Sequence, residues 1–199
     1  MKQMNLPQMS TAKPFKHKSQ STSNVECQNI LNQRFNPSAP NKVWVCDFTY
    51  LRAEGRFYYL CVILDLFSIM VIAYKLSSKI DTQLAIDTLN IAVASRGASA
   101  GIIFHTDRGC QFTSAIFRKH LDNLNMIQSF SAKGHPYDNA VMECFFKYLK
   151  KEETDRRYYS SFEDLKLSIF KYINGFYNSF RPHSHNNGLS PSHAEKLFY

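Results

Sequence analysis

The sequence contains no Cys-x-x-Cys pair, and its five cysteines are odd in number. Several lie inside apolar runs, unlike the evenly paired framework of a small secreted domain. No cysteine cluster accompanies the histidines, which argues against a structural zinc site. The cysteines therefore predict free thiols in a reducing compartment, which means a cytoplasmic protein.

Apolar segments that could act as a leader or cross a bilayer are also missing. The first ten residues, M-K-Q-M-N-L-P-Q-M-S, lack the apolar region of a signal peptide. The most apolar stretch, residues 58–74, is interrupted by Asp65 and Ser68. Its β-branched and aromatic residues fit two buried strands joined by a tight turn better than a membrane span. We therefore expect no membrane partner.

The composition is that of an ordinary folded domain with basic ends. The chain has 199 residues, 44% of them hydrophobic and 20% charged, which is enough for one domain with a substantial core. The formal charge of +8 is concentrated in residues 1–41 and 144–199, whereas residues 42–143 are nearly balanced. Basic flanks suit a polyanionic partner such as nucleic acid, although a need for solubility explains the same charge equally well.

The pattern along the chain predicts a polar linker followed by a folded core. Residues 1–41 are polar and aperiodic, which is typical of a flexible linker or remnant, and residues 42–199 form the predicted core. Alternating or apolar segments predict strands at 43–50, 57–64, 67–75, 101–107 and 127–131, with a hairpin turn at 54–56. Helical periodicity predicts helices at 82–95, 115–125, 140–152 and after 160–163. We expect an α/β fold with a mixed five-stranded sheet, in which a three-strand antiparallel meander leads into parallel strands flanked by helices.

Several polar residues are candidate helix caps. Asp81 and Ser114 precede the first two helices, Asp138 or Asn139 precedes the third, and S-S-F-E (160–163) matches a capping box. The residues expected to face inward are Ile116, Phe117, Leu121 and Leu124 on the second helix and Leu165, Ile169, Tyr172, Ile173 and Phe176 on the last.

Three acidic residues lie on separate predicted elements. Asp47 is inside the first strand, Asp107 ends the fourth, and Glu143 is one turn into the 140–152 helix. A carboxylate in an apolar strand must be paired, protonated or bound to a metal, so an ion pair between Asp47 and Arg108 is the plain alternative. In phosphodiester chemistry, carboxylates hold two hard cations about 3.5–4 Å apart. Magnesium keeps several waters, so three protein carboxylates are enough for such a site.

The neighbours of these acids allow both functional and structural interpretations. Gly109 lets the chain turn away and leaves Asp107 at the edge of the sheet. His105 is either a hydrogen-bond partner of the site or an ordinary buried histidine. Asp65 is interpreted as a turn residue. Glu152 and Glu153 are expected to be solvated. Glu143, Lys147 and Lys150 share one helix face, where a solvent-exposed ion pair is the plain explanation.

Four motifs in order resemble a known family. They are D-F-T-Y (47–50), H-T-D-R-G-x-Q-F-T-S (105–114), K-G-x-P-Y-D-N-A-V-M-E-C-F-F-K-Y-L-K-K-E (133–152) and Y-N-S-F-R-P-H (177–183) with L-S-P (189–191). They are similar to the OrfB-type transposases of the insertion-sequence-three family, relatives of the retroviral integrase core. Thirty-five residues separate Asp107 from Glu143, the interval of that family's Asp-Asp-Glu motif. The resemblance covers about residues 26–199.

The resemblance implies a ribonuclease-H-like fold and a DNA transposase catalytic core that cleaves and joins strands at insertion-sequence ends. Asp47, Asp107 and Glu143 would be the catalytic ligands of Mg²⁺, for which Mn²⁺ can substitute. Double-stranded DNA would be the partner, with Lys133, Lys147, Lys150 and Arg181 as candidate DNA contacts. The alternative for the C-terminal motif is a packing role, with Tyr177 and Phe180 in the core and Arg181 at the surface. The protein would act as a homo-oligomer on DNA in the bacterial cytoplasm, associated with the nucleoid.

Two other functions remain open at this point. Relatives carry helix-turn-helix segments before the core and are often fused to an upstream reading frame, whereas only a short polar stretch precedes Lys42. A catalytically inactive or regulatory DNA-binding fragment is therefore the main alternative, and an upstream-frame helix-turn-helix protein is a possible partner. A simple nuclease of the same fold differs only in whether water or a 3′-OH attacks.

Overall fold

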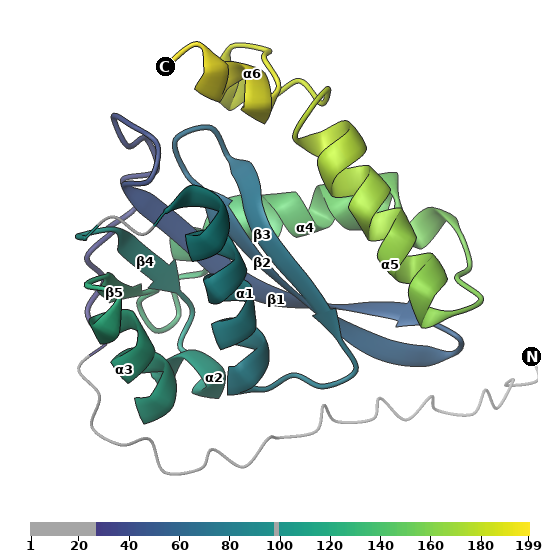
Figure 1. Ribbon diagram of the computed structural model, residues 1–199, viewed down its shortest axis with the longest axis horizontal. Coiled ribbons are helices and arrows are strands. Elements are labelled where there is room, and N and C mark those ends of the chain that lie inside the picture. Colours follow the sequence, from purple (N-terminus) through teal and green to yellow (C-terminus); the bar gives the residue numbers. More distant parts are fainter. Residues whose placement is uncertain (1–26, 98–99) are drawn as a thin grey trace, which may run out of the picture.

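The protein is described by a computed structural model that covers residues 27–97 and 100–199 (Figure 1). Its centre is a five-stranded sheet in the order β3-β2-β1-β4-β5. The strands are β1 (Val43–Ala53), β2 (Arg56–Asp65), β3 (Met70–Ser77), β4 (Ile103–Thr106) and β5 (Ile127–Phe130). The first three strands pair antiparallel, and β1, β4 and β5 pair parallel. The predicted mixed sheet is confirmed.

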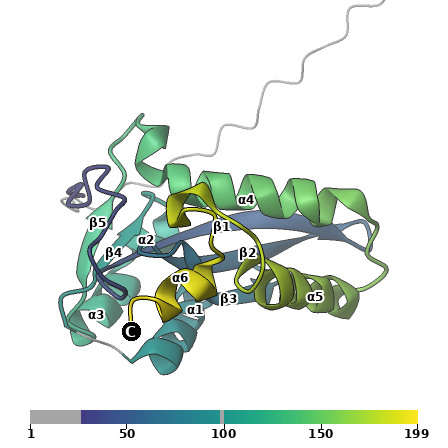
Figure 2. The same cartoon turned by 90° about the horizontal axis from the view of Figure 1, so that it is seen from above.

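Helices cover both faces of this sheet. They are α1 (Thr82–Arg96), α2 (Cys110–Thr113), α3 (Ala115–Asn123), α4 (Ala140–Glu152), α5 (Phe162–Phe170), which continues as the π-helix η3 (Lys171–Tyr177), and α6 (Pro191–Lys196). Seen from above, α4 lies along one face of the sheet and α1 and α3 lie along the other (Figure 2). No helix in the described ranges is both long and apolar enough to cross a membrane.

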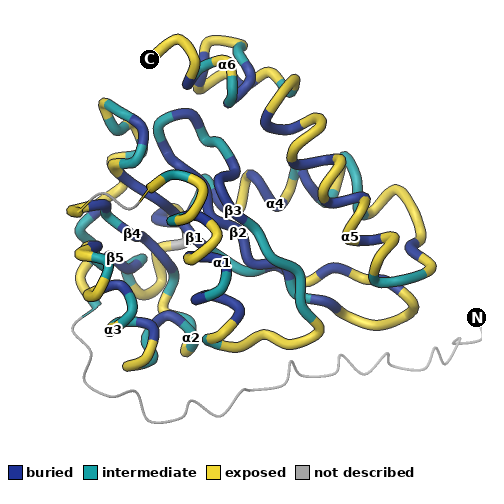
Figure 3. The backbone as a smooth tube through the Cα atoms, viewed as in Figure 1, coloured by how far each residue is buried: buried dark blue, intermediate teal, exposed yellow. Residues whose placement is uncertain are grey.

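Alternation along β1 divides the core into two parts. Val43 and Val45 pack with the residues of α4 and α5, whereas Trp44 and Cys46 pack with α1 and α3. The central strands are buried on both faces, as the tube coloured by burial shows (Figure 3). Asp47 follows the same alternation as Val45, so its side chain lies on the α4 side of the sheet.

The turns and most of the caps follow the predictions. Glu54 and Gly55 both adopt positive φ, at 52° and 74°, which suits the tight turn between β1 and β2. Asp81 caps α1 by accepting from the Leu84 N–H at 2.8 Å. Ser114 caps α3 by accepting from the Phe117 N–H at 3.2 Å.

Three local predictions are wrong in detail. Ile116 is 70% exposed because α3 turns only its Phe117 side toward the core. Phe176 is 44% exposed, although it was expected on the inner face of the last helix. The cap of α5 is Ser161, which accepts from the Asp164 N–H at 3.0 Å, one residue after Ser160, the cap that the predicted box implies.

The turn between β2 and β3 is held by Asp65 and by the C-terminal segment. The buried Asp65 carboxylate accepts from the N–H groups of Asn41 and Phe67, so β3 starts only at Met70. The Asn178 side chain pairs with both backbone groups of Val71, and Asn186 donates to the Ser68 carbonyl. Much of the C-terminal motif therefore serves to hold this turn.

Residues 27–41 lie against the core. Leu31 is 2% exposed and belongs to the hydrophobic cluster on the α4 side. The Phe130 N–H donates to the Gln28 carbonyl at 2.9 Å, which ties this segment to the end of β5. The structure thus places residues 27–41, assigned to the linker from the sequence, with the folded core. Residues 1–26 lie outside the described ranges.

Candidate active site

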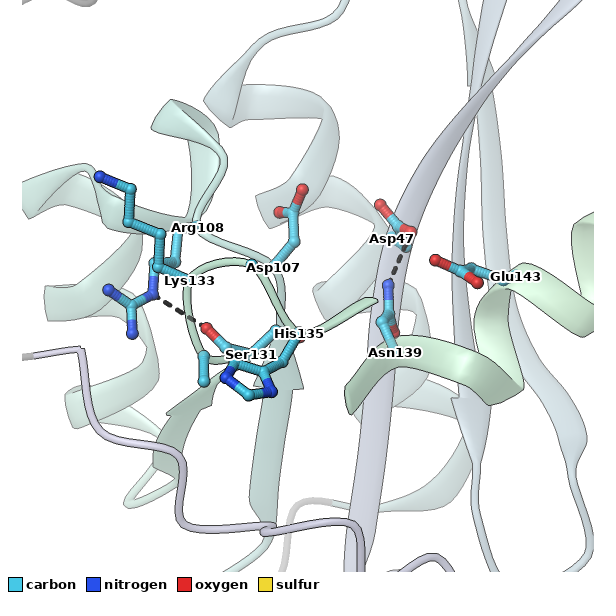
Figure 4. A pocket seen from close by; sticks show the side chains of 10 residues that line it. Asp47, Asp107, Arg108, Ser131, Lys133, His135, Asn139 and Glu143 are labelled. Carbon is cyan, nitrogen blue, oxygen red and sulfur yellow. Dashed lines mark hydrogen bonds between the residues drawn. The ribbon is translucent and has the colours of Figure 1, made fainter. Parts of the chain in front are cut away.

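Three acidic side chains from three elements line one pocket of about 420 Å³ (Figure 4). Asp47 comes from β1, Asp107 from the residue after β4, and Glu143 from the first turn of α4. The parallel pairing of β1 and β4 brings the first two to neighbouring positions, because Cys46 stands opposite Thr106. The other lining residues are Arg108, Ser131, Ala132, Lys133, Gly134, His135 and Asn139.

Asp47 is a largely buried carboxylate whose partners are neutral. Its Oδ1 accepts from the Phe48 N–H at 2.7 Å, and its Oδ2 accepts from Nδ2 of Asn139 at 2.7 Å. Burial and, after it, the negative charge of Asp107 raise the pKa of Asp47 to about 7. The charge of Glu143 acts in the same direction. No positively charged side chain among the described residues therefore neutralises the Asp47 carboxylate.

The suggested ion pair between Asp47 and Arg108 is wrong. The Arg108 guanidinium instead donates to the carbonyls of Ser131 and Cys27, at 2.9 and 3.2 Å. Figure 4 shows it directed to the opposite side of the pocket from Asp47. With the ion pair to Arg108 excluded, a buried Asp47 is either protonated, as its raised pKa allows near neutral pH, or bound to a cation.

Asp107 is held by the turn that follows it. Its Oδ1 accepts from the Gly109 N–H at 2.9 Å, and burial raises its pKa above the usual range. Gly109 has φ −56°, so the left-handed conformation is not what requires glycine here. A Cβ at this position would lie 3.0 Å from Oδ1 of Asp107 and from Oε1 of Gln111. Close approach to the carboxylate is the reason for glycine.

Glu143 is the most exposed of the three acids. Its carboxylate projects from α4 toward Asp47 (Figure 4). The opposite side of α4 carries the buried residues Met142, Phe145, Phe146 and Leu149, so packing against the sheet determines which way Glu143 points. An exposed glutamate on a fixed helix can adjust its rotamer without disturbing the core.

The chemistry of this pocket fits a hard divalent cation. Within the described part of the chain, no three His, Cys, Asp or Glu side chains are already arranged to hold a metal ion. However, the charges of Asp107 and Glu143 oppose ionisation of Asp47, and a divalent cation would relieve that repulsion. Oδ1 of Asn139 is buried and has no partner among the described residues, which leaves one more oxygen donor at the site. Carboxylate and amide oxygens are the ligands that Mg²⁺ accepts.

His105 and Asp138 are structural rather than direct parts of the pocket. The buried His105 ring lies between the hydroxyls of Ser129 and Ser131, and burial lowers its pKa to about 4. Asp138 does not cap α4, because its carboxylate accepts from the Ala132 N–H at 2.8 Å and from two side chains of residues 29 and 33. Of the two predicted caps, Asp138 is therefore wrong, whereas Asn139 does occupy the N-cap position.

Asn139 is the residue at this site that the sequence interpretation missed. It occupies the N-cap position of α4, but its side chain makes no capping bond and reaches Asp47 instead. Its position four residues before Glu143, on the same side of a helix start, was the available signal.

The predicted DNA-contacting residues have different environments. Lys133 lines the pocket and Lys147 is exposed on α4. The Lys150 ammonium lies 4.4 Å from the centre of the Tyr50 ring. Arg181 lines a separate pocket, forms a 2.7 Å ion pair with Glu152 and covers the ring of Tyr148 at 3.9 Å. DNA contact by all four stays a prediction. Of the packing alternative, Tyr177 is buried as expected, whereas Phe180 is exposed and Arg181 is partly buried in its ion pair.

Glu152 and Glu153 are not solvated, contrary to expectation. Glu152 accepts from Arg181 and from the Tyr172 hydroxyl, and Glu153 accepts from the Ser168 hydroxyl. Both join the end of α4 to the C-terminal helices.

Comparison with known proteins gives the same assignment as the motifs. The integrase core domain family matches residues 37–136, and a second integrase core domain family matches residues 124–191. The chain is 36% identical over 182 residues to the transposase for insertion sequence element IS904 of Lactococcus lactis, which covers 92% of this chain and 72% of that relative. The chain belongs to the integrase-core family of insertion-sequence transposases. It is also 42% identical to transposase InsF for insertion sequence IS3A of Escherichia coli, but spans only 58% of that relative's length.

Solved structures identify the fold of this transposase-family chain. A chain of the simian T-cell lymphotropic virus intasome aligns with a TM-score of 0.66 at 20% identity, over 80% of this chain and 56% of that chain. The HTLV-2 integrase catalytic core domain, solved in complex with magnesium in a dimeric form, aligns with a TM-score of 0.57 at 18% identity, over 79% of this chain and 98% of that chain. The predicted ribonuclease-H-like fold is confirmed.

Proposed function

We propose that this protein cleaves a phosphodiester at the end of an insertion sequence and joins the freed 3′-OH to a second phosphodiester. Asp47, Asp107 and Glu143 would be its catalytic residues. The observation that carries the proposal is the convergence of these three carboxylates in one pocket in which Asp47 has no cationic partner among the described residues. The alternative of an inactive regulatory fragment gains nothing from this arrangement.

The same three residues would hold Mg²⁺, with Mn²⁺ as a substitute, and the Asn139 carbonyl oxygen is a further donor. When bound, the metal supplies Lewis-acid stabilisation of the attacking and leaving oxygens in an in-line displacement. The Asn139 amide keeps the Asp47 carboxylate turned into the pocket. The Gly109 N–H does the same for Asp107.

The basic residues near the pocket would hold the phosphates of DNA. Lys133 is on the rim beside Arg108, and Lys147 and Lys150 continue along α4 on the face that carries Glu143. Ammonium and guanidinium groups at such positions fix the backbone of a duplex without reading its sequence. Arg181 would contribute mainly by holding Glu152.

We further propose that the protein acts as a homo-oligomer on double-stranded DNA, with an upstream-frame helix-turn-helix protein or fusion available for end recognition. The related HTLV-2 integrase core has been solved in dimeric and trimeric forms. Joining requires two element ends to be brought together, and an oligomer would supply one active site for each end.

The test is metal-dependent cleavage and joining of a duplex that carries candidate element ends. Glu143→Gln removes one carboxylate charge from an exposed position, so folding and DNA affinity should be retained while joining falls by at least about 10³-fold. Glu163→Gln, at an exposed position in the first turn of α5, is the matched control. Joining by the Glu143→Gln variant at the wild-type rate would refute the three-carboxylate mechanism.

A further inference from the structure

Residues 27–35 lie across the edge of the sheet beside the pocket, and we call this segment the strap. The N–H groups of Ile30 and Leu31 both donate to the hydroxyl of Ser129 in β5, at 3.0 Å each. Leu31 is nearly fully buried in the core on the α4 side. The centre of the strap is therefore anchored to β5 and to the core. Residues nearer its two ends contact other parts of the site.

One side of the strap holds the loop that leads into α4. The Asn29 Nδ2 donates to Oδ2 of Asp138 and the Gln33 Nε2 donates to Oδ1, each at 2.8 Å. The Ala132 N–H also donates to Oδ2. Asp138 is 3% exposed. Although burial alone would raise its pKa, the bonds from Ala132 and Gln33 hold the pKa below the usual range.

The strap also reaches the other wall of the pocket. Arg108, the residue after Asp107, donates to the Cys27 carbonyl at 3.2 Å and to the Ser131 carbonyl at 2.9 Å. The strap therefore contacts the direct chain neighbours of both Asp107 and Asn139. No carboxylate of the active site touches it directly.

We propose that Asn29 and Gln33, acting through Asp138, are positioning residues that set the Asn139 amide against Asp47. The reason is the order of contacts: the strap fixes Asp138, Asp138 fixes both ends of the loop from Ala132 to Asn139, and Asn139 fixes Asp47. This inference rests on the proposed function and deepens it. It makes the segment next to the first 26 residues part of the catalytic apparatus.

The physical basis is the geometry of a buried carboxylate with a full set of donors. The side-chain amides of Asn29 and Gln33 each donate a hydrogen bond to the charged Asp138, and such bonds are stronger than neutral ones. Loss of one donor leaves a buried carboxylate oxygen undersatisfied, so the loop shifts to find another partner. Because Asn139 follows Asp138 directly, this shift reaches the 2.7 Å bond to Asp47.

The test uses the 199-residue chain with Asn29→Ala, Gln33→Ala and both together. The matched control is Gln83→Ala, whose amide also donates to an aspartate, Asp87, but on α1. The first readout is amide hydrogen exchange without metal or DNA. We expect exchange at Ala132 and His135 to rise about tenfold for each strap variant, while amides between β1 and β2 remain unchanged. The control should change neither.

The second readout is kinetic. In the double variant we expect kcat for end joining to fall about tenfold with KM for DNA unchanged, because the Asn29 and Gln33 amides donate to Asp138 and not to a residue proposed to bind phosphate. Mn²⁺ binding to the DNA-free protein, followed by electron paramagnetic resonance, should weaken by a similar factor.

Each outcome decides between the two proposals. Unchanged loop exchange, or faster exchange with kcat and Mn²⁺ affinity at wild-type values, overturns the strap inference and leaves the proposed function standing. A wild-type protein that neither joins ends nor binds Mn²⁺ overturns the proposed function itself. Should the double variant unfold, the single variants, at partly exposed positions, provide the same three readouts.

Discussion

Nδ2 of Asn139 donates a 2.7 Å hydrogen bond to Oδ2 of Asp47, across 92 residues of sequence. The bond links the start of α4 to the middle of β1, the two elements that contribute Glu143 and Asp47. It also lowers the pKa of Asp47, opposing the effects of burial and of Asp107. The relative position of two proposed metal ligands thus depends on an uncharged side chain.

Replacing Asn139 should therefore slow catalysis without unfolding the protein. In Asn139→Ala the pKa of Asp47 rises further, and the joining rate near neutral pH should fall by about 10–100-fold. Part of the loss should be recovered at higher pH, because the acidic limb of the pH–rate profile moves upward. Asn90→Ala, which removes a contact to His120 away from the pocket, is the control. An unshifted acidic limb would contradict this role.

The raised pKa of Asp47 predicts the pH dependence of stability without metal. The folded-state pKa is about 7, against about 3.9 in an unfolded chain. The folded state binds this proton more tightly, so the contribution is fully present below about pH 4 and is lost as pH rises through about 7. Between about pH 5 and pH 8 in a chelator, the unfolding free energy of the wild type should fall by on the order of 2 kcal/mol more than that of Asp47→Asn.

Urea unfolding at the two pH values measures this difference. Asp87→Asn is the control, because hydrogen bonds from Lys75 and Gln83 lower the pKa of Asp87. Its contribution is lost only as pH falls through that lowered pKa, outside the window. Added Mg²⁺ should stabilise the wild type at the higher pH and leave Asp47→Asn unaffected. Equal slopes for wild type and Asp47→Asn would show that Asp47 is not under repulsion.

Gly109→Ala should damage the site more than the fold. The added Cβ would lie 3.0 Å from Oδ1 of Asp107, so the carboxylate must move, and we expect metal affinity to fall by about tenfold or more. Gly175→Ala in η3 places its Cβ in open space and should be neutral or stabilising by about 0.5–1 kcal/mol. Metal-dependent thermal shifts of both variants provide the comparison. Wild-type metal affinity in Gly109→Ala would mean that the close approach of residue 109 does not determine the position of the Asp107 carboxylate.

The roles of Arg181 and Lys133 can be distinguished by measuring the stability of each alanine variant and the salt dependence of its DNA affinity. Arg181→Ala breaks a half-buried ion pair with Glu152 and should lower the unfolding free energy by about 2 kcal/mol, with little change in DNA affinity of the folded protein. Lys133→Ala should leave stability within about 0.5 kcal/mol but reduce the slope of log affinity against log salt by about 0.9. Lys79→Ala, on an exposed turn, is the control. The reverse pattern would make Arg181 the DNA contact.

The sequence by itself determined the sheet and the positions of the three acids. Alternating and apolar segments predicted the five strands, and side-chain caps at Asp81 and Ser114 predicted where two helices start. These features depend on local periodicity and on hydrogen bonds within three residues, which neighbouring residues largely decide. The motifs placed Asp47, Asp107 and Glu143 in order, before any distance between them was known.

Only the tertiary structure decided the partners of these side chains. Asp138 and Asn139 both looked like caps of α4, yet one binds the strap and the other binds Asp47, at separations of more than 90 residues. The sequence predicted a solvated Glu152, but in the folded chain Arg181 forms an ion pair with it. The physical reason is that a polar side chain binds whichever donor or acceptor packing brings within about 3 Å, and no periodicity in the sequence records that choice.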